Sequence, residues 1–446
     1  MTYDDVTRYP GMRRLIACTA LILLTGLLGG LVPAAPAPPA QAALPSCTAT
    51  GWLSAWYAAP SDALLSQPPI EQTFRVQVRP LHQGSVARFR LSNRFGGGPV
   101  TFGAVTVGKQ LSGPAIVDGT LRGLTFAGAR RVTIPARGEV LSDPVRVEVR
   151  SGQVLLLSMH VVGAPGPATQ HAIAEQTTWQ SAPLSGNRTG SLSGTGFFAL
   201  PLKVAPTLPQ NIPYVAGMDV VAPKRVGAVV AFGDSITDGT EAEALPFLVS
   251  AQNIDKFYAW PDRLAARIQA AGLPFSVANA AISGNQLLRD SAVPVFGRSG
   301  LSRFGRDALA RDGVTTVILL EGINDIGQSL ASRDQLVAGY TQAIDAAHAR
   351  GVRILLGTLT PMGGTVQPLG YGALGEPTRV AVNRWIRTQT LADGVIDFDK
   401  AVRDPAKPTR ILPAYDGGDH LHFSAAGYQA LANAVPLSLL KRRACS

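Results

Sequence analysis

The chain has 446 residues, which is long for one ordinary domain and predicts two. Its 46% hydrophobic and 16% charged residues are typical of a globular protein and exclude a disordered chain. The formal net charge of +10 comes from dispersed Lys and Arg, so a solvated surface, or attraction to an anionic cell wall or polysaccharide, is favoured over nucleic-acid binding.

The first segment has the features of an export signal. An arginine pair at 13–14 precedes an apolar run at 15–32, and a small-residue cleavage site follows at 40–42. We therefore predict a signal peptide at 1–42 and a secreted protein with no stable membrane anchor after cleavage. An uncleaved anchor is the alternative, and the export route stays open. No second segment is apolar enough to span a bilayer.

The cysteines are consistent with export. Cys18 lies within the predicted signal, so the mature chain keeps only Cys47 and Cys445, at its two ends. In an oxidising compartment these two can form one intramolecular bridge. We predict a disulfide that joins the two ends of the mature chain, with two free thiols as the alternative.

Residues 43–223 are predicted to form an all-β, sandwich-like accessory domain. Short runs with apolar residues at alternate positions are separated by Gly, Pro, Asn and Ser, as at 73–79, 86–91, 145–149 and 153–161. Many short strands without helical segments between them are typical of an antiparallel sandwich.

The pattern changes in the second part of the chain, which we assign to a domain at 224–446. Apolar strand candidates now alternate with amphipathic stretches of helical length, and this alternation predicts a parallel sheet with helices on both faces. The strand candidates are 227–232, 275–280, 314–320, 352–358 and 394–398, and the helix candidates are 260–271, 335–349, 378–390 and 424–440.

Two separated segments of this domain offer the groups that acyl transfer through a serine requires. The first apolar strand ends at Gly233 and delivers Ser235 to the carboxyl end of the sheet, where ligands bind in open parallel sheets. A serine needs a base within hydrogen-bonding reach and an acid that orients it. The other histidines lie on strand-like runs or on an amphipathic helix. This leaves His420 and His422, on a loop that also carries Asp419.

Four blocks of the sequence together resemble the GDSL/SGNH hydrolase superfamily. They occupy 233–235, 280–285, 322–325 and 419–422, and they read Gly-Asp-Ser, Ala-Ala-Ile-Ser-Gly-Asn, Gly-Ile-Asn-Asp and Asp-His-Leu-His. The resemblance covers about 225–440 and implies a flavodoxin-like, three-layer α/β/α hydrolase domain. The β-rich part is similar to the N-terminal part of longer secreted members, although this second match is less specific.

The resemblance also implies a catalytic triad. The family pattern Asp-x-x-His selects Asp419 and His422 as partners of the nucleophile Ser235, in preference to the alternatives Asp416 and His420. The family usually has glycine where His420 stands. This departure leaves open whether His420 lines the pocket or is a solvated neighbour.

The donors of an oxyanion hole are likewise implied by the resemblance. They are the backbone N–H groups of Ser235 and Gly284 and the side-chain amide of Asn324. Glycine allows close backbone approach, and an amide donates without a competing charge. Taken alone, Gly284 would be an ordinary turn glycine and Asn324 a helix cap or turn residue.

Three neighbours of these residues are predicted to support the site. Asp234 and Asp325 can accept backbone N–H bonds and brace the catalytic loops, and Asn285 can hold the geometry of its block.

These observations predict a secreted serine esterase that works through an acyl-enzyme, without metal or organic cofactor. Its expected partner is a small-molecule or polysaccharide ester, with no nucleic acid and an oligomeric state that the sequence leaves open. A lipase- or phospholipase-type acylhydrolase is one alternative, and a non-catalytic cell-wall or glycan-binding protein is another. The α/β-hydrolase elbow G-x-S-x-G is excluded because Thr237 takes its last position. The sequence also lacks phosphate-loop, HExxH and CxxC spacings.

Overall fold

The computed structural model describes residues 46–63, 68–199, 211–240 and 254–440. Residues 44–446 form one compact unit, and the predicted signal at 1–42 lies outside the described residues. None of the described helices combines the length and the apolar character that crossing a membrane would require.

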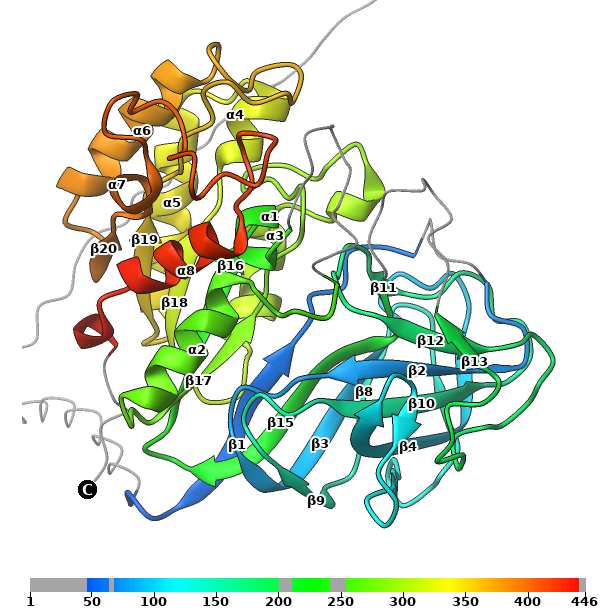
Figure 1. The fold of residues 1–446 in the computed structure, drawn as a ribbon. Helices are drawn as coiled ribbons and strands as arrows, with labels where there is room; N and C mark the ends of the chain where they lie inside the picture. The colour runs from blue at the N-terminus through cyan, green and yellow to red at the C-terminus, as the bar shows by residue number, and fades with distance from the viewer. Residues whose placement is uncertain (1–45, 64–67, 200–210, 241–253, 441–446) are drawn as a thin grey trace, which may run out of the picture. The chain divides into compact units, whose positions relative to one another are not determined.

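The N-terminal part is β-rich, as predicted, and consists mainly of two antiparallel sheets (Figure 1). The first sheet has the order β1-β15-β3-β8, and β9 also pairs with β3. The second has the order β13-β12-β2-β10-β4-β5, with β6 and β7 on β4, while β11 pairs with β14. Their bounds are β1 Thr50–Tyr57, β2 Gln72–Val78, β3 Gly84–Ser92, β4 Val100–Ser112, β5 Ala115–Ile116, β6 Arg122–Gly123, β7 Val132–Ile134, β8 Glu139–Leu141, β9 Val145–Val149, β10 Leu155–Val161, β11 Gln170–His171, β12 Thr178–Ser181, β13 Phe197–Ala199, β14 Ile212–Pro213 and β15 Val215–Pro223.

One hydrophobic core joins the two antiparallel sheets. Phe89 of β3 and Met218 of β15 come from the first sheet, and Phe102 of β4 and Met159 of β10 come from the second. All four side chains are buried, and Phe102 meets the Tyr214 ring edge-on with a centroid distance of 5.2 Å. Burial of alternate side chains between two sheets is the main source of stability in such a sandwich.

The C-terminal part contains a five-stranded parallel sheet with the order β17-β16-β18-β19-β20. In chain order this is 2-1-3-4-5, the order of flavodoxin-like sheets. The elements are β16 Gly227–Gly233, α1 Ser235–Asp238, α2 Trp260–Ala270, β17 Phe275–Asn279, α3 Gly300–Phe304, β18 Val314–Leu320, α4 Ile323–Ser329, α5 Arg333–His348, β19 Arg353–Gly357, α6 Glu376–Thr388, β20 Gly394–Ile396, α7 Phe398–Val402 and α8 Ala425–Ala434.

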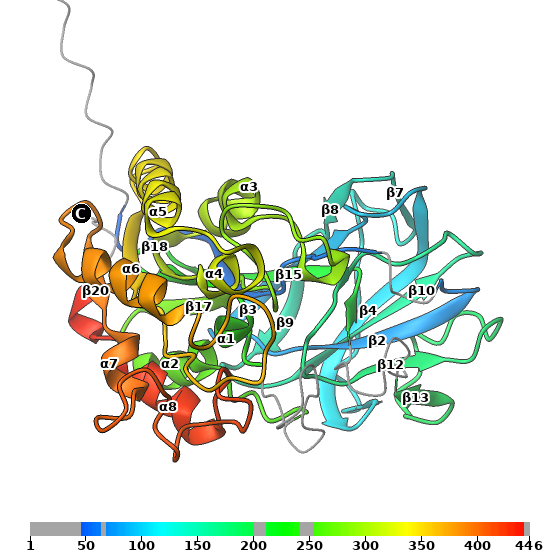
Figure 2. The same ribbon diagram turned by 90° about the horizontal axis from the view of Figure 1, so that it is seen from above.

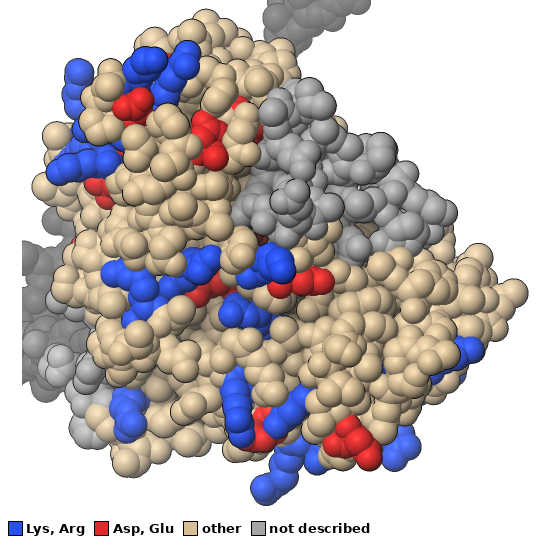
Figure 3. Space-filling view, viewed as in Figure 1, with Lys and Arg blue, Asp and Glu red and all other residues tan. Residues whose placement is uncertain are grey.

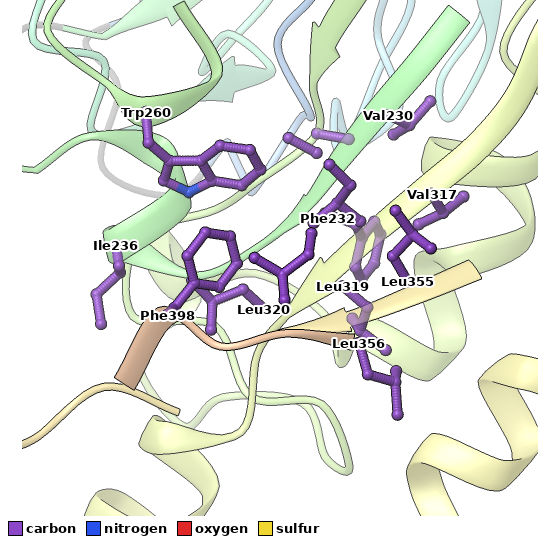
Figure 4. Close-up of a cluster of buried hydrophobic side chains, with 14 of the residues drawn as sticks. Val230, Phe232, Ile236, Trp260, Val317, Leu319, Leu320, Leu355, Leu356 and Phe398 are labelled. Carbon is purple, nitrogen blue, oxygen red and sulfur yellow. The ribbon is translucent and has the colours of Figure 1, made fainter. Parts of the chain in front are cut away.

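Helices cover both faces of this sheet. Figures 1 and 2 show α2 and α8 on one face and α3 and α5 on the other. The strands are buried on both faces, which explains why they read as nearly continuous apolar runs. Figure 4 shows the core, where the Trp260 and Phe398 rings lie 5.4 Å apart and Phe232 lies beside Leu319 and Leu320.

All five predicted strands of this part are present, but one predicted helix is shorter than expected. The stretch 424–440 forms α8 only as far as Ala434, and a short 3-10 turn at Leu437–Leu439 follows it. Pro436 lies between them, and a proline within a helix has no N–H to donate and clashes with the preceding turn. The apolar spacing continued past this break and so overestimated the length of the helix.

The β-rich part and the α/β part are joined by buried polar contacts. The Ser276 hydroxyl donates to the Ser54 carbonyl at 2.7 Å, and the Tyr57 hydroxyl donates to Asp307 Oδ1 at 2.6 Å. The expected boundary at 223/224 falls at the end of β15, three residues before β16 begins. The division into two domains stays a prediction.

Charged side chains are scattered over the face of the molecule drawn in Figure 3. Lys and Arg lie there in separate groups, several of them beside Asp or Glu, on a mostly uncharged surface.

Candidate active site

Ser235 lies where β16 ends and the short helix α1 begins. Asp234 caps this helix, and its side chain accepts the Ile236 N–H at 3.0 Å. The chain turns sharply because Gly233 lies against the next strand: a Cβ there would come within 2.3 Å of the Leu320 carbonyl oxygen. The turn places the Ser235 side chain, 7% exposed, at the carboxyl end of the parallel sheet.

The loop before α8 brings an imidazole and a carboxylate to this serine. His422 Nε2 lies 2.8 Å from Ser235 Oγ, and His422 Nδ1 lies 2.7 Å from Asp419 Oδ2. The three residues predicted to form a triad are therefore in direct contact, although Ser235 and His422 are 187 positions apart in the chain. A nucleophile, a base and an orienting acid in one hydrogen-bonded line can transfer a proton from serine during attack on a carbonyl.

The carboxylate of Asp419 is fully buried and held by its own loop. Asp419 Oδ1 accepts the backbone N–H of Leu421 at 3.0 Å and that of His422 at 2.8 Å. Burial alone would raise the pKa of Asp419, but the His422 ring and these backbone donors outweigh burial and lower it to about 2. Asp419 therefore stays charged at neutral pH and can stabilise an imidazolium.

Ser235, Gly284 and Asn324, the residues of the three predicted oxyanion donors, all line the same cavity. Asn324, near the start of α4, has a fixed amide orientation: its Oδ1 accepts the Tyr371 hydroxyl at 2.5 Å, and its Nδ2 donates to the Asn285 carbonyl at 2.8 Å. The second N–H of Asn324 Nδ2 is not used by this bond and can donate to another acceptor. Among the hydrogen bonds between described residues, none uses the backbone N–H of Ser235 or of Gly284.

Gly284 occupies a position that no other residue could take without strain. Its φ of 75° is left-handed, and a Cβ would come within 2.3 Å of the Phe296 ring. The backbone of this loop can therefore lie against the aromatic ring, with Gly284 at the cavity. This conformation is compatible with both interpretations of Gly284, and its role as an oxyanion donor stays a prediction.

The three predicted supporting residues are buried and hold loops around the site. Asp325 accepts the backbone N–H groups of Leu287 and Leu288 at 2.7 and 2.8 Å, and Asn285 Nδ2 donates to two carbonyls of the 296–298 segment. Asp234 is the helix cap described above. All three bond to backbone groups, and Asn285 Oδ1 also accepts the Arg303 Nε–H at 2.8 Å.

Buried acids lie behind the nucleophile, away from the cavity. Desolvation raises the pKa of Asp234 to about 7, that of Asp325 to about 6 and that of Glu321 to about 8. Arg303 lies beside this group, with its guanidinium 3.5 Å from Glu321 and donating to the Gly233 carbonyl at 3.0 Å. Glu321 is buried within this group of acids.

His420 is turned away from the serine. It has a left-handed backbone with φ of 60°, and its Nδ1 lies 2.5 Å from Asp416 Oδ2. Its side chain is 45% exposed, against 9% for that of His422. The alternative pair Asp416 and His420 therefore forms a separate dyad at the surface, and the spacing Asp-x-x-His selects the pair that reaches Ser235.

A cavity of about 610 Å³ opens at Ser235 and His422. Its apolar lining includes Ile173, Phe296 and Leu369, and its polar lining includes Gln286 and Gln328. Sequence reasoning missed Tyr371, which orients Asn324, and Ile173, which comes from the β-rich part. Neither lies in a recognisable motif that would single it out.

Two further predictions concern residues beyond this site. Cys47 is described but Cys445 lies outside the described residues, so their disulfide stays a prediction. Within the described ranges, no group of three or more His, Cys, Asp or Glu side chains could hold a metal ion.

Comparison with known proteins is consistent with this arrangement. Residues 231–430 match the GDSL-like Lipase/Acylhydrolase family. Similar solved structures include a carbohydrate acetylesterase from Sinorhizobium meliloti (18% identity, 47% of this chain and 95% of that chain, TM-score 0.38). Another is an aryl esterase from M. smegmatis (18% identity, 47% of this chain and 96% of that chain, TM-score 0.38). A third is a GDSL-like lipase from Bacteroides thetaiotaomicron (16% identity, 49% of this chain and 89% of that chain, TM-score 0.36). No curated protein matches the chain.

The family match spans the segments that carry Ser235, Gly284, Asn324, Asp419 and His422. Residues 231–430 therefore form a GDSL-like lipase/acylhydrolase domain, which supports a carboxylic ester hydrolase.

Proposed function

We propose that the protein is a serine esterase that hydrolyses esters through a covalent acyl-enzyme. The observation that carries this proposal is the continuous line from Ser235 Oγ through the His422 ring to Asp419, with distances of 2.8 and 2.7 Å. Ser235 Oγ attacks the ester carbonyl carbon while His422 Nε2 takes its proton. Asp419 fixes the ring with its proton on Nδ1 and stabilises the imidazolium that forms.

The carbonyl oxygen becomes negatively charged during this attack. The N–H groups of Ser235 and Gly284 and the Asn324 amide are the donors proposed to stabilise it. When the tetrahedral species collapses, the ester C–O bond breaks and His422 gives its proton to the leaving alcohol. Water then attacks the acyl-enzyme, His422 takes a proton from it, and the acid is released as Ser235 regains its hydrogen.

The cavity, whose lining also includes Arg289 and Asp290, suggests an ester with an acyl or aryl group larger than acetyl. A volume of about 610 Å³ far exceeds a methyl group, and Ile173, Phe296 and Leu369 offer apolar contact beside the nucleophile. The amides of Gln286 and Gln328 can accept or donate to a polar alcohol such as a sugar. Small-molecule and polysaccharide esters both fit this description.

A series of p-nitrophenyl esters tests this substrate class. We expect kcat/KM to rise about tenfold from acetyl to butyryl, because two buried methylene groups contribute about 0.8 kcal/mol each. A steady fall from acetyl to hexanoyl, together with acetate release from acetylated xylan, would instead support a polysaccharide deacetylase. A continued rise to long-chain esters would support a lipase-type acylhydrolase.

We also propose that the protein is exported, with its signal removed near Ala42 and Cys47 joined to Cys445. The arginine pair, apolar run and small-residue site at 13–42 support export, and the position of both remaining cysteines at the ends of the mature chain supports the bridge. Intact mass spectrometry of protein from the culture medium, with and without reduction, should give the cleaved and oxidised mass. A full-length mass, or thiols that react without reduction, would contradict the corresponding part.

A further inference from the structure

A buried ion pair connects the β-rich part to the helix that carries the nucleophile. His171 of β11 is 5% exposed, and its Nε2 lies 3.2 Å from Oδ1 of Asp238, the last residue of α1. We propose that His171, through Asp238, positions the loop that carries the proposed oxyanion donor Gly284. The β-rich part would then be a component of the active site. This inference rests on the proposed serine-esterase function.

Both nitrogens of the His171 ring face oxygen acceptors. Nδ1 lies 2.9 Å from the Ala59 carbonyl, which can only accept, and Nε2 faces the Asp238 carboxylate. A ring that donates from both nitrogens is an imidazolium. Burial would lower the pKa of His171, but Asp238 and the carbonyl partners raise it overall. The result is a charged pair of His171 and Asp238. The His171 ring of this pair is also held by the Ala59 carbonyl, which lies just after β1.

Asp238 passes this constraint to the loop that carries Gly284. Its Oδ2 accepts the Ser283 backbone N–H at 3.0 Å and the Ser283 hydroxyl at 2.7 Å. Thr240 Oγ1 lies 2.6 Å from the same hydroxyl. Asp238 therefore holds the residue directly before Gly284 by two bonds, and His171 holds Asp238.

The constraint acts on the relative position of two proposed oxyanion donors. Ser235 begins α1 and Asp238 ends it, while Gly284 follows Ser283 directly, so the pair links the helix and the loop that carry these donors. A donor must lie within tenths of an ångström of its place to stabilise the oxyanion, and a shift of about 1 Å can reduce a rate about a hundredfold. Ile173, two residues after His171, lines the cavity itself.

Substitution of His171 tests this role against a purely structural one. We expect His171→Phe to lower kcat on p-nitrophenyl butyrate ten- to a hundredfold, with KM changed less than about twofold, because the oxyanion exists only in the transition state. His171→Gln, which can offer an amide N–H to Asp238, should restore most of kcat. All rates are measured well below each variant's melting temperature.

His160 provides a matched control. It is also a buried histidine of the β-rich part, and its Nε2 lies 2.9 Å from Glu71 Oε1, but among the described residues this pair makes no hydrogen bond to α1 or to the loop that carries Gly284. His160→Phe should lower the melting temperature and leave kcat unchanged. If His171→Phe does not fold, Ser283→Ala takes its place, with a several-fold loss of kcat at constant KM expected because the hydroxyl bonds to Asp238 and Thr240 are removed.

Unchanged kcat in His171→Phe, or in Ser283→Ala where the former is insoluble, would overturn the proposal. An equal loss of kcat in His160→Phe would also overturn it, since the effect would then follow from stability alone. Failure of the serine-esterase proposal has a different signature: Ser235→Ala would keep its turnover. The two outcomes are therefore distinguishable.

Discussion

Ser235→Ala is expected to lower kcat for p-nitrophenyl butyrate by about 10⁴- to 10⁶-fold, to the level that the remaining binding groups support. The substitution removes the attacking oxygen, and no other described hydroxyl lies within hydrogen-bonding distance of His422 Nε2. The fold should persist, because the hydrogen bond of the Ser235 side chain is the one to His422. The cap of helix α1 comes from Asp234, which the substitution leaves in place. Ester hydrolysis and thermal melting measured on the same sample check both statements.

Ser332→Ala is the matched control for this experiment. Ser332 caps α5, where its hydroxyl accepts the Gln335 N–H and the Gln335 side chain accepts the Ser332 N–H. Loss of the cap should cost about 1 kcal/mol of stability without any effect on turnover. If Ser235→Ala retained wild-type turnover, the assignment of the nucleophile would be wrong.

The same pair of proteins decides between an enzyme and a glycan-binding protein on a hydrolase scaffold. An organophosphonate should label the wild-type protein at Ser235 and leave Ser235→Ala unlabelled, because labelling needs the serine to be activated by its base. A wild-type protein that resists labelling and hydrolyses no ester, yet sediments with insoluble polysaccharide, would support the binding protein.

Asp419→Asn is expected to lower kcat about 10⁴-fold while leaving the fold in place, the size of effect known for this change in a serine triad. An amide in place of the carboxylate can present an N–H to His422 Nδ1, which reverses the tautomer and leaves Nε2 unable to accept the proton of Ser235. It also removes the charge that stabilises the imidazolium. Steady-state kinetics at neutral pH measure the loss.

Asp416→Asn is the control for this substitution. Asp416 holds His420 in the same loop and at a similar distance, but the His420 ring does not contact Ser235. We expect less than a tenfold change in kcat, so the two acids should differ by about three orders of magnitude. Equal losses would show that the loop, and not the Asp419 charge, determines the rate.

The pKa of Asp419 also sets the direction of an acid effect. Its value of about 2 in the folded protein lies below the usual value for an unfolded chain, about 3.9. The stability that this carboxylate contributes is therefore fully present above pH 4 and is lost as the pH falls towards 2. Asp419→Asn should reduce this component of acid denaturation, whereas the raised pKa values of Asp234 and Glu321 oppose it.

Much of the α/β part could be predicted because local and global signals agree there. The strands are continuous apolar runs, which the sequence shows directly. Gly233, the glycine that ends β16 in the sequence pattern, is also the residue that the close approach of β18 requires to lack a side chain. Elimination of the other histidines left both His420 and His422 open, and the family pattern Asp-x-x-His then selected Asp419 and His422, which is the pair that contacts Ser235. The end of α8 was missed because apolar spacing continued past Pro436.

The remainder depends on contacts between distant segments, which carry no local pattern. Tyr371 reaches Asn324 from a loop 47 positions away, and His171 reaches Asp238 from another sheet. Both look like ordinary residues in sequence, since an aromatic or a histidine on a short strand is most often packed or solvated. Only the placement of the surrounding backbone gives them a function.

The contacts of β1 affect whether the α/β part can be separated from the β-rich part. Tyr57 caps the buried acid Asp307, its ring lies 4.2 Å from the Arg311 guanidinium, and Ser54 accepts a bond from β17. Cutting the chain before β16 would remove the Tyr57 hydroxyl from Asp307 and the Ser54 carbonyl from Ser276, and would leave Asp307 with Arg306 and Arg303 as its partners. We therefore expect a chain that begins at β16 to be less stable than the chain that keeps β1, because these buried contacts are missing from it.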